Sequence, residues 1–168
     1  GDKIIPIGLA ARHLNKTMDY PDGASNQLTY WKQHGLLNEL PGHGVPANSN
    51  WADASTGDIN LRARAYLDIN CGHCHSRNGA ANTSGLFLDI HNNDPTALGI
   101  MKTPVAAGRG SGKLDVDIMP GHADKSILIY RMNTTDPGIA MPEIGREQIH
   151  TEALAVLREW INTMKASN

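Results

Sequence analysis

Cys71-Gly72-His73-Cys74-His75 is the stretch of this sequence from which the rest is interpreted. Its two thiols are three positions apart, which is about one turn of a helix, and an imidazole follows directly. No other cysteine occurs in the 168 residues, so no thiol is left for a disulfide or a second cluster. Cys-x-x-Cys-His is the attachment signature of a c-type haem. The motif therefore predicts one covalent haem c, held by Cys71 and Cys74, with His75 as an axial ligand of the iron.

Three other interpretations of the pentapeptide stay open. A dithiol redox motif has the same cysteine spacing but follows a strand and opens a helix, whereas residues 60–69 are rich in helix formers. A structural zinc site needs a second Cys/His pair at close spacing, and His91 or His122 would have to supply it from elsewhere in the fold. The third interpretation is a chance match. We favour haem over all three.

Composition excludes several classes of partner. The formal charge of −2 comes from mixed acidic and basic residues and gives no basic footprint for nucleic acid or anionic lipid. No apolar run approaches the eighteen or so residues of a membrane span, so we expect no membrane span. Because haem is attached to cysteines outside the cytoplasm, the motif predicts a periplasmic or secreted bacterial protein whose leader has been removed.

Two segments have the periodicity of helices that pack together. One begins at residues 56–58 and runs into Cys71, with Leu61, Ala65 and Ile69 on one face. The clearer one is at the C-terminus, where Ala153, Leu157, Trp160 and Met164 form an apolar stripe. We expect the last helix to pack across the helix that leads into Cys71.

Other segments have weaker patterns. They are a short helix at 25–34, a turn-rich loop at 41–50, strands or extended loop at 86–90 and 113–118, and a helix at 124–132. We divide the chain into an N-terminal extension at 1–55, packed on the haem domain, and a haem domain at 56–168.

This order of elements resembles the class I cytochrome c family over about residues 56–166. The attachment motif, Ala140-Met141-Pro142 and Leu157-Arg158-Glu159-Trp160-Ile161 carry the resemblance. It implies a mainly all-α fold of the cytochrome c type, with crossed first and last helices around a covalent haem and an irregular or short-strand insertion. It also implies a loop methionine as the second axial ligand.

A further resemblance is to a poorly characterised group of secreted bacterial c-type cytochromes, often multihaem or multidomain. The stretches that carry it are Pro6-Ile-Gly, Ala11-Arg-His-Leu-Asn15, Asn26-Gln-Leu, Arg62-Ala-Arg-Ala-Tyr-Leu-Asp68 and Pro120-Gly121. Members of that group often have another attachment motif upstream of the segment that matches Pro6. This resemblance implies that the chain is one haem domain of a longer multidomain protein.

Two methionines are candidates for the second axial ligand, because Met119 and Met141 are each followed by proline, which stiffens the loop beside the sulfur. Met141 follows His75 by 66 positions and directly precedes the last helix, as in the family, so we favour it over Met119. The other methionines, at 18, 101, 132 and 164, are interpreted as loop or packing residues, and the histidines outside the motif as surface residues. Possible partners for the haem carboxylates are Arg62, Arg64, Arg77, Arg109 and Arg131.

The function that we expect is electron transfer by a monohaem c-type cytochrome between redox protein partners outside the cytoplasm. An iron with both His75 and Met141 as ligands has no vacant position for substrate, so we expect no enzymatic activity. Two alternatives stay open: a haem enzyme or sensor with an open iron site, such as a peroxidase, and the electron-accepting module of a larger dehydrogenase.

Overall fold

The computed structural model describes residues 7–41, 43–145 and 147–165. The chain forms two compact units, Gly1–Asn48 and Ser49–Asn168. The sequence analysis placed this division between residues 55 and 56; Trp51 belongs to the second unit, where Arg62 Nε donates a hydrogen bond of 3.0 Å to its carbonyl. That the first unit packs on the second stays a prediction. Pro6, which carries part of one resemblance, lies outside the described residues.

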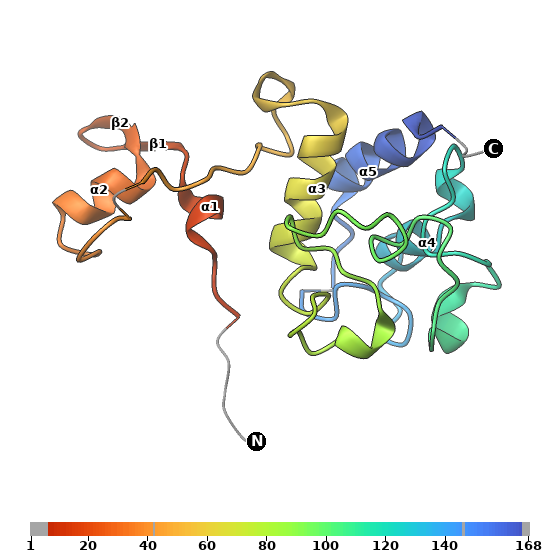
Figure 1. Cartoon of the computed structure of the whole chain (residues 1–168). Helices are drawn as coiled ribbons and strands as arrows, with labels where there is room; N and C mark the ends of the chain where they lie inside the picture. Colours follow the sequence, from red (N-terminus) through yellow and green to blue (C-terminus); the bar gives the residue numbers. More distant parts are fainter. Residues whose placement is uncertain (1–6, 42, 146, 166–168) are drawn as a thin grey trace. The chain divides into compact units, whose positions relative to one another are not determined.

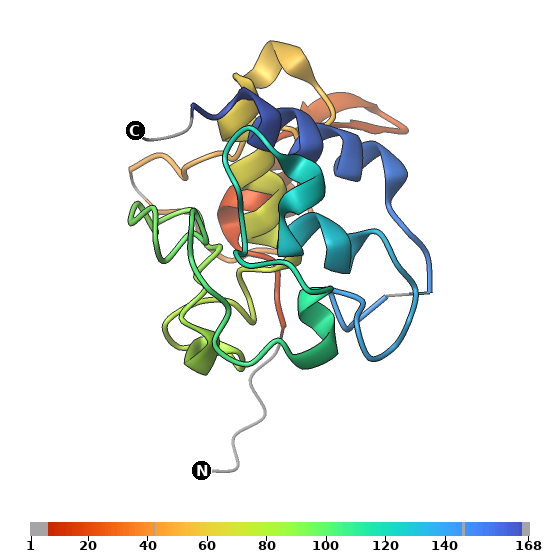
Figure 2. The ribbon, with the colours of Figure 1, turned by 90° about the vertical axis from the view of Figure 1, so that its right-hand side faces the viewer.

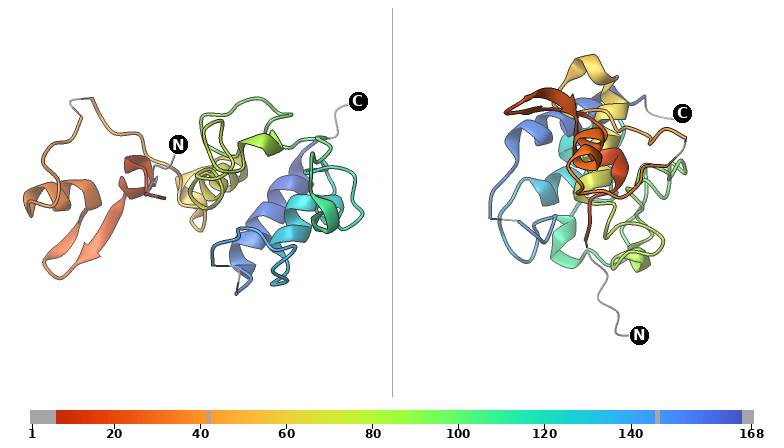
Figure 3. Two further views of the ribbon diagram at one scale, coloured as in Figure 1. Left: turned by 90° about the horizontal axis from the view of Figure 1, so that it is seen from below. Right: turned by 90° about the vertical axis from the view of Figure 1, so that its left-hand side faces the viewer.

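The first unit contains a hairpin that the sequence analysis did not predict. Strands β1 (Thr17–Tyr20) and β2 (Gly23–Asn26) pair antiparallel around the two-residue turn Pro21-Asp22 (Figure 3). Gly23 has φ of +121°, a conformation that glycine adopts readily.

Two helices complete the first unit. They are the single turn α1 (Ala11–Leu14) and α2 (Gln27–Gln33), which confirms the short helix predicted at 25–34. The Asn26 side chain caps α2 by accepting hydrogen bonds from the N–H groups of Leu28 and Thr29. The hairpin is tied to α2 by Tyr20 and Tyr30, whose rings stack at 3.6 Å.

Three α-helices form the frame of the second unit: α3 (Ile59–Asn70), α4 (Ile127–Met132) and α5 (Thr151–Thr163). The Asp58 carboxylate caps α3 by accepting the Leu61 N–H at 2.8 Å. Helix α5 packs against both α3 and α4 (Figures 1 and 2), as its apolar stripe predicts for α3. Leu67 of α3 and Leu157 and Ile161 of α5 are fully buried in the core between the helices.

The predicted core face of α3 is partly wrong. Leu61 is 49% exposed and Ile69 is half-buried, whereas Ala65 is buried as predicted, and Ala63, Tyr66 and Leu67 lie in the core. The polar residues Arg64 and Asp68 of α3 are also buried, against the loop at 89–92. A periodicity of apolar residues does not reveal burial of this kind.

The long segment between the motif and α4 is held by turns. Its regular structure consists of the 3₁₀ helices η2 (Asn82–Ser84), η3 (Gly108–Ser111) and η4 (Ala123–Lys125); η1 (Ala54–Thr56) precedes α3. Isolated bridges join Ile100 to Ile118 and Val116 to Ser126, and within the described part of this segment no strand forms. Of the two forms expected at 86–90 and 113–118, extended loop is therefore the one present.

The predicted mainly all-α fold of the cytochrome c type is wrong. The described residues are 35% helical and include a two-stranded antiparallel sheet, a mixed architecture with low helix content. Frequent Gly, Pro and Asn residues stop helices between α3 and α4, and the backbone groups there are satisfied by local turns instead. No helix in the described part of the chain is long and apolar enough to cross a membrane.

Candidate functional site

The Cys-x-x-Cys-His motif forms one further turn at the C-terminal end of α3. The N–H groups of Cys71 and Gly72 both donate to the Leu67 carbonyl, at 2.8 and 2.9 Å. The Cys71 carbonyl in turn accepts from Cys74 N–H at 3.1 Å and from His75 N–H at 2.8 Å. Cys71, Cys74 and His75 therefore lie on one backbone turn, and that they hold one haem together stays a prediction.

The two cysteines are free and differ in exposure. Cys71 is 8% exposed, and Cys74 is half-buried. Burial raises the pKa of the Cys71 thiol to about 12, and the neighbouring Cys74 adds to the rise. A dithiol redox site needs a thiolate of lowered pKa, commonly at a helix N-terminus, so this position at a helix C-terminus with a protonated thiol does not fit one.

The zinc interpretation finds no support either. Among the residues that the structure describes, no three His, Cys, Asp or Glu side chains gather into a group that could hold a metal ion. Neither His91 nor His122 therefore supplies the second pair of ligands that a closed tetrahedral zinc site requires.

His75 is half-buried. Burial lowers the pKa of its imidazole; a hydrogen bond to the Leu86 backbone opposes the shift, and the charge of Arg131 adds to it. Nδ1 lies 3.4 Å from Ser84 Oγ, and the His75 carbonyl accepts the Leu88 N–H at 2.8 Å. These contacts hold the ring and the backbone of His75 in place, as is usual for a histidine that binds a metal.

Arg64 and Asp68, one turn apart on α3, fasten the loop at 89–92 beside the motif. Arg64 Nη2 donates to the carbonyls of Asp89, Ile90 and Asn92 at 3.0, 3.2 and 2.6 Å. Asp68 Oδ1 accepts the Ile90 N–H at 2.9 Å. Both side chains are buried, at 7% and 3% exposure. Sequence reasoning missed this supporting pair; its only signal was an arginine and an aspartate four positions apart within an apolar helix.

Gly72 allows this loop to approach closely. A Cβ at this position would lie 2.7 Å from the Asp68 carbonyl oxygen and 3.1 Å from Asp89 Cα, so any side chain would push the loop away. Gly72, the second residue of the motif, is therefore set by packing.

Most of the arginines that were expected to pair with haem carboxylates have protein partners. Arg62 donates to a backbone carbonyl, Arg64 to three carbonyls, Arg77 lies 5.1 Å from the centre of the Phe87 ring, and Arg109 pairs with Asp136 at 2.5 Å. Arg131 Nε donates to the Ile139 carbonyl at 2.9 Å. Arg131 is the one of these five whose charge contributes to the lowered pKa of His75.

Both candidate methionines are half-buried and have fixed backbones. Met141 N–H donates to the Arg131 carbonyl at 3.0 Å, and the Met141–Pro142 peptide bond is cis. Met119 N–H donates to Ser126 Oγ at 2.9 Å. That the Met141 sulfur, and not that of Met119, faces His75 stays a prediction.

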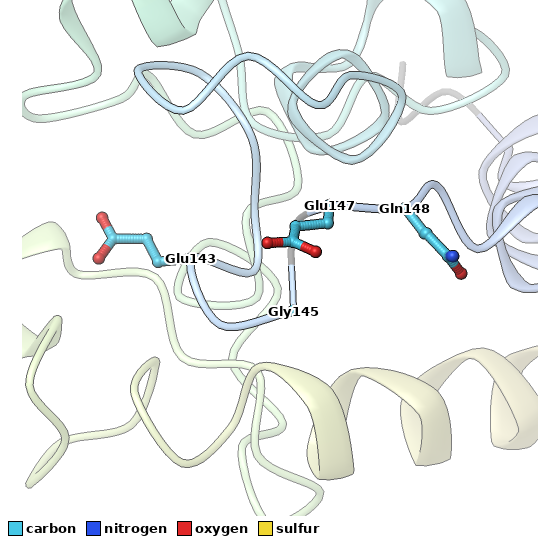
Figure 4. A pocket seen from close by; sticks show the side chains of 4 residues that line it. All are labelled: Glu143, Gly145, Glu147 and Gln148. Atoms are coloured by element: carbon cyan, nitrogen blue, oxygen red, sulfur yellow. The ribbon is translucent and has the colours of Figure 1, made fainter.

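Two open hollows lie beside these segments. One, of about 380 Å³, is lined by residues of the loop that follows Pro142: Glu143, Gly145, Glu147 and Gln148 (Figure 4). The other, of about 420 Å³, is lined by the three residues that follow the motif and by residues of the segment at 87–94: Ser76, Arg77, Asn78, Phe87, Asp89, His91, Asn92, Asn93 and Asp94.

Comparison of the chain with family models, with curated proteins and with solved structures found no match. The functional assignment therefore rests on the residues and contacts described above.

Proposed function

We propose that this chain carries one covalent haem c and transfers single electrons between redox protein partners outside the cytoplasm. Cys71 and Cys74 would hold the haem through thioether bonds, and His75 would be an axial ligand of its iron. The observation that carries the proposal is a complete attachment motif folded into one turn, with two free thiols and a half-buried imidazole.

The residues around the motif fit the demands of such a group. Both cysteines are free, as thioether formation requires, and the imidazole of His75 is oriented by Ser84 and by the Leu86 backbone. When bound, a haem supplies an iron that accepts and releases one electron. The hydrogen bonds of Arg64 and Asp68 keep the turn and the loop beside it in place, which limits structural change when charge moves.

Met141 is the proposed second axial ligand. A thioether is a soft, neutral donor, and a Met/His pair raises the reduction potential of the iron relative to two imidazoles. With the iron held by His75 and Met141, substrate would have no open position on the metal, and the domain would transfer electrons without catalysis of its own. A haem enzyme or sensor would need an open position on the iron.

Mass spectrometry tests the attachment. The full chain is produced in a periplasm with a haem-attachment system and extracted with acid acetone, which removes non-covalent haem. We expect the mass of the chain plus one haem. Cys71→Ala and Cys74→Ala should each leave at most one thioether bond, which shifts the pyridine haemochrome band, while Cys71→Ala/Cys74→Ala should lose the haem. Recovery of the bare chain mass, or of bound zinc, refutes the proposal.

Optical spectroscopy tests the second ligand. The ferric protein should show the weak long-wavelength band of sulfur-to-iron charge transfer, and Met141→Ala should abolish it, with Met119→Ala as the matched control. Loss of the band only in Met119→Ala would show that the wrong loop was chosen. Rapid binding of carbon monoxide by the unsubstituted ferrous protein would instead favour the enzyme or sensor.

A further inference from the structure

Three aromatic rings from separate segments of the second unit meet beside α3. Trp51 comes from the loop before α3, Tyr66 from the middle of α3, and His150 from the residue that precedes α5. The centre of the Trp51 ring lies 4.8 Å from that of His150 and 5.7 Å from that of Tyr66, with both pairs edge-on. This cluster has no part in the function proposed above.

Tyr66 and His150 are also joined by a hydrogen bond. Tyr66 Oη lies 3.2 Å from His150 Nδ1. Tyr66 is only 4% exposed, and burial, with a smaller contribution from Cys71, raises the pKa of its phenol to about 12. The phenol therefore keeps its proton at neutral pH and donates it to Nδ1 when the imidazole carries its own proton on Nε2.

The surroundings of the pair provide both a path for an electron and a place for a proton. Trp51 is half-buried and touches both rings, so it connects the buried phenol with the protein surface. His150 is exposed, so positive charge on its imidazole is solvated by water. A tyrosine loses an electron readily only when its phenolic proton can leave at the same time, and a hydrogen-bonded imidazole is a suitable acceptor.

We propose that Tyr66 and His150 form a proton-coupled redox site that is separate from the Cys-x-x-Cys-His motif. A one-electron oxidant stronger than the tryptophan couple takes an electron from Trp51, and Tyr66 returns one electron to the oxidised indole. The O–H bond of Tyr66 breaks and an N–H bond forms at His150 Nδ1. The products are a neutral tyrosyl radical, an imidazolium and the reduced oxidant, with Trp51 unchanged.

The site gives an oxidising equivalent a position next to the motif. Tyr66 lies in α3 near enough to Cys71, the residue that follows the helix, for the cysteine to affect its pKa. An electron removed at the surface would come from a phenol that can be reduced again, and not from a thiol, whose oxidation to the sulfinic or sulfonic acid is irreversible.

Flash photolysis and electron paramagnetic resonance test the proposal on the full chain. A photogenerated ruthenium(III) tris-bipyridyl complex is the oxidant, and ferricyanide keeps any attached haem ferric, so that it cannot supply the electron. We expect the frozen sample to show a tyrosyl radical whose hyperfine pattern changes when the tyrosines are ring-deuterated. Tyr66→Phe keeps the ring and should abolish the signal, while Tyr130→Phe is the matched control and should retain it.

The role of His150 is tested separately. His150→Phe keeps a ring beside Trp51 but removes the proton acceptor, so the rate of radical formation should fall by roughly a hundredfold. The unsubstituted chain should also form the radical more slowly in D₂O. A signal that survives Tyr66→Phe, or an unchanged rate in His150→Phe, overturns the proposal. Circular dichroism confirms folding of each variant; if Tyr66→Phe fails to fold, the rate in His150→Phe decides. The readout is an organic radical, so a chain without haem leaves this test intact.

Discussion

Replacing Trp160 with alanine should remove a large part of the stability of the second unit. The side chain is 3% exposed between α5 and α3, and its Nε1–H donates to Asn60 Oδ1 at 3.0 Å. Burial of a tryptophan removes about 200 Å² from water, which corresponds to about 5 kcal/mol at ~25 cal/mol per Å². Truncation of buried tryptophans costs ~3–5 kcal/mol, against a total of ~5–15 kcal/mol for a domain. With a slope of about 2 kcal/mol per molar urea, the midpoint should fall by about 2 M.

Urea titrations followed by circular dichroism check this value, with three control variants. Trp160→Phe keeps most of the ring and loses the bond to Asn60, so it should cost less than Trp160→Ala. Asn60→Ala leaves the buried indole N–H without its partner, at a cost of about 1–3 kcal/mol. Trp31→Ala lies in the first unit, where its side chain is half-buried, and should lower the midpoint less. Similar small losses at Trp160 and Trp31 would refute the packing of α5 on α3 as the main source of stability.

Two further predictions concern buried charges. Arg64→Met removes three hydrogen bonds to the 89–92 loop, so it should lower the free energy of unfolding by about 2–4 kcal/mol and speed amide exchange in that loop. The control Arg62→Met removes one hydrogen bond and should cost about 1 kcal/mol. Equal costs for the two variants would contradict the role of Arg64 in holding the loop. Burial raises the pKa of Asp117, and its ion pair with Lys102 at 3.3 Å opposes the rise. A carboxyl group whose pKa is raised in the folded state contributes less to stability as pH rises through that pKa. Because Lys102 opposes the rise, Lys102→Met should lose more stability at about pH 7, where Asp117 ionises, than at about pH 4. Equal losses in urea titrations at the two pH values would contradict this.

The helices were predictable where local chemistry and tertiary packing agree. Asp58 precedes α3 and caps it, and the four-three-four spacing around Leu157 and Trp160 matches the buried side of α5. The motif turn was predictable for the same reason, because it continues α3 and uses the carbonyls of Leu67 and Cys71. In these segments short-range hydrogen bonds determine the structure.

The remaining structure depends on contacts that no local pattern contains. Apolar periodicity assigned Leu61 to the core and gave no sign that Arg64 is buried. Arg64 is buried because its guanidinium donates hydrogen bonds to backbone carbonyls 25 to 28 positions further along the chain. The hairpin had a visible signal in Pro21-Asp22-Gly23, which is typical turn chemistry, but its strands are too short and polar to show alternation. The prediction of the fold class was wrong because one motif and one terminal helix were taken to imply the helix content of a whole family.

The relative position of α3 and α5 determines two separate features of the second unit. Helix α3 carries Tyr66 and ends at Asn70, directly before Cys71, while His150 immediately precedes α5. The distance between Tyr66 Oη and His150 Nδ1 therefore depends on the same helix packing that fixes the start of the attachment turn. A shift of about 1 Å that moves His150 directly away from Tyr66 would stretch this contact of 3.2 Å beyond hydrogen-bond range. Because Trp160 fills the space between these helices, a cavity at that position should disturb both sites together, although neither contains the tryptophan.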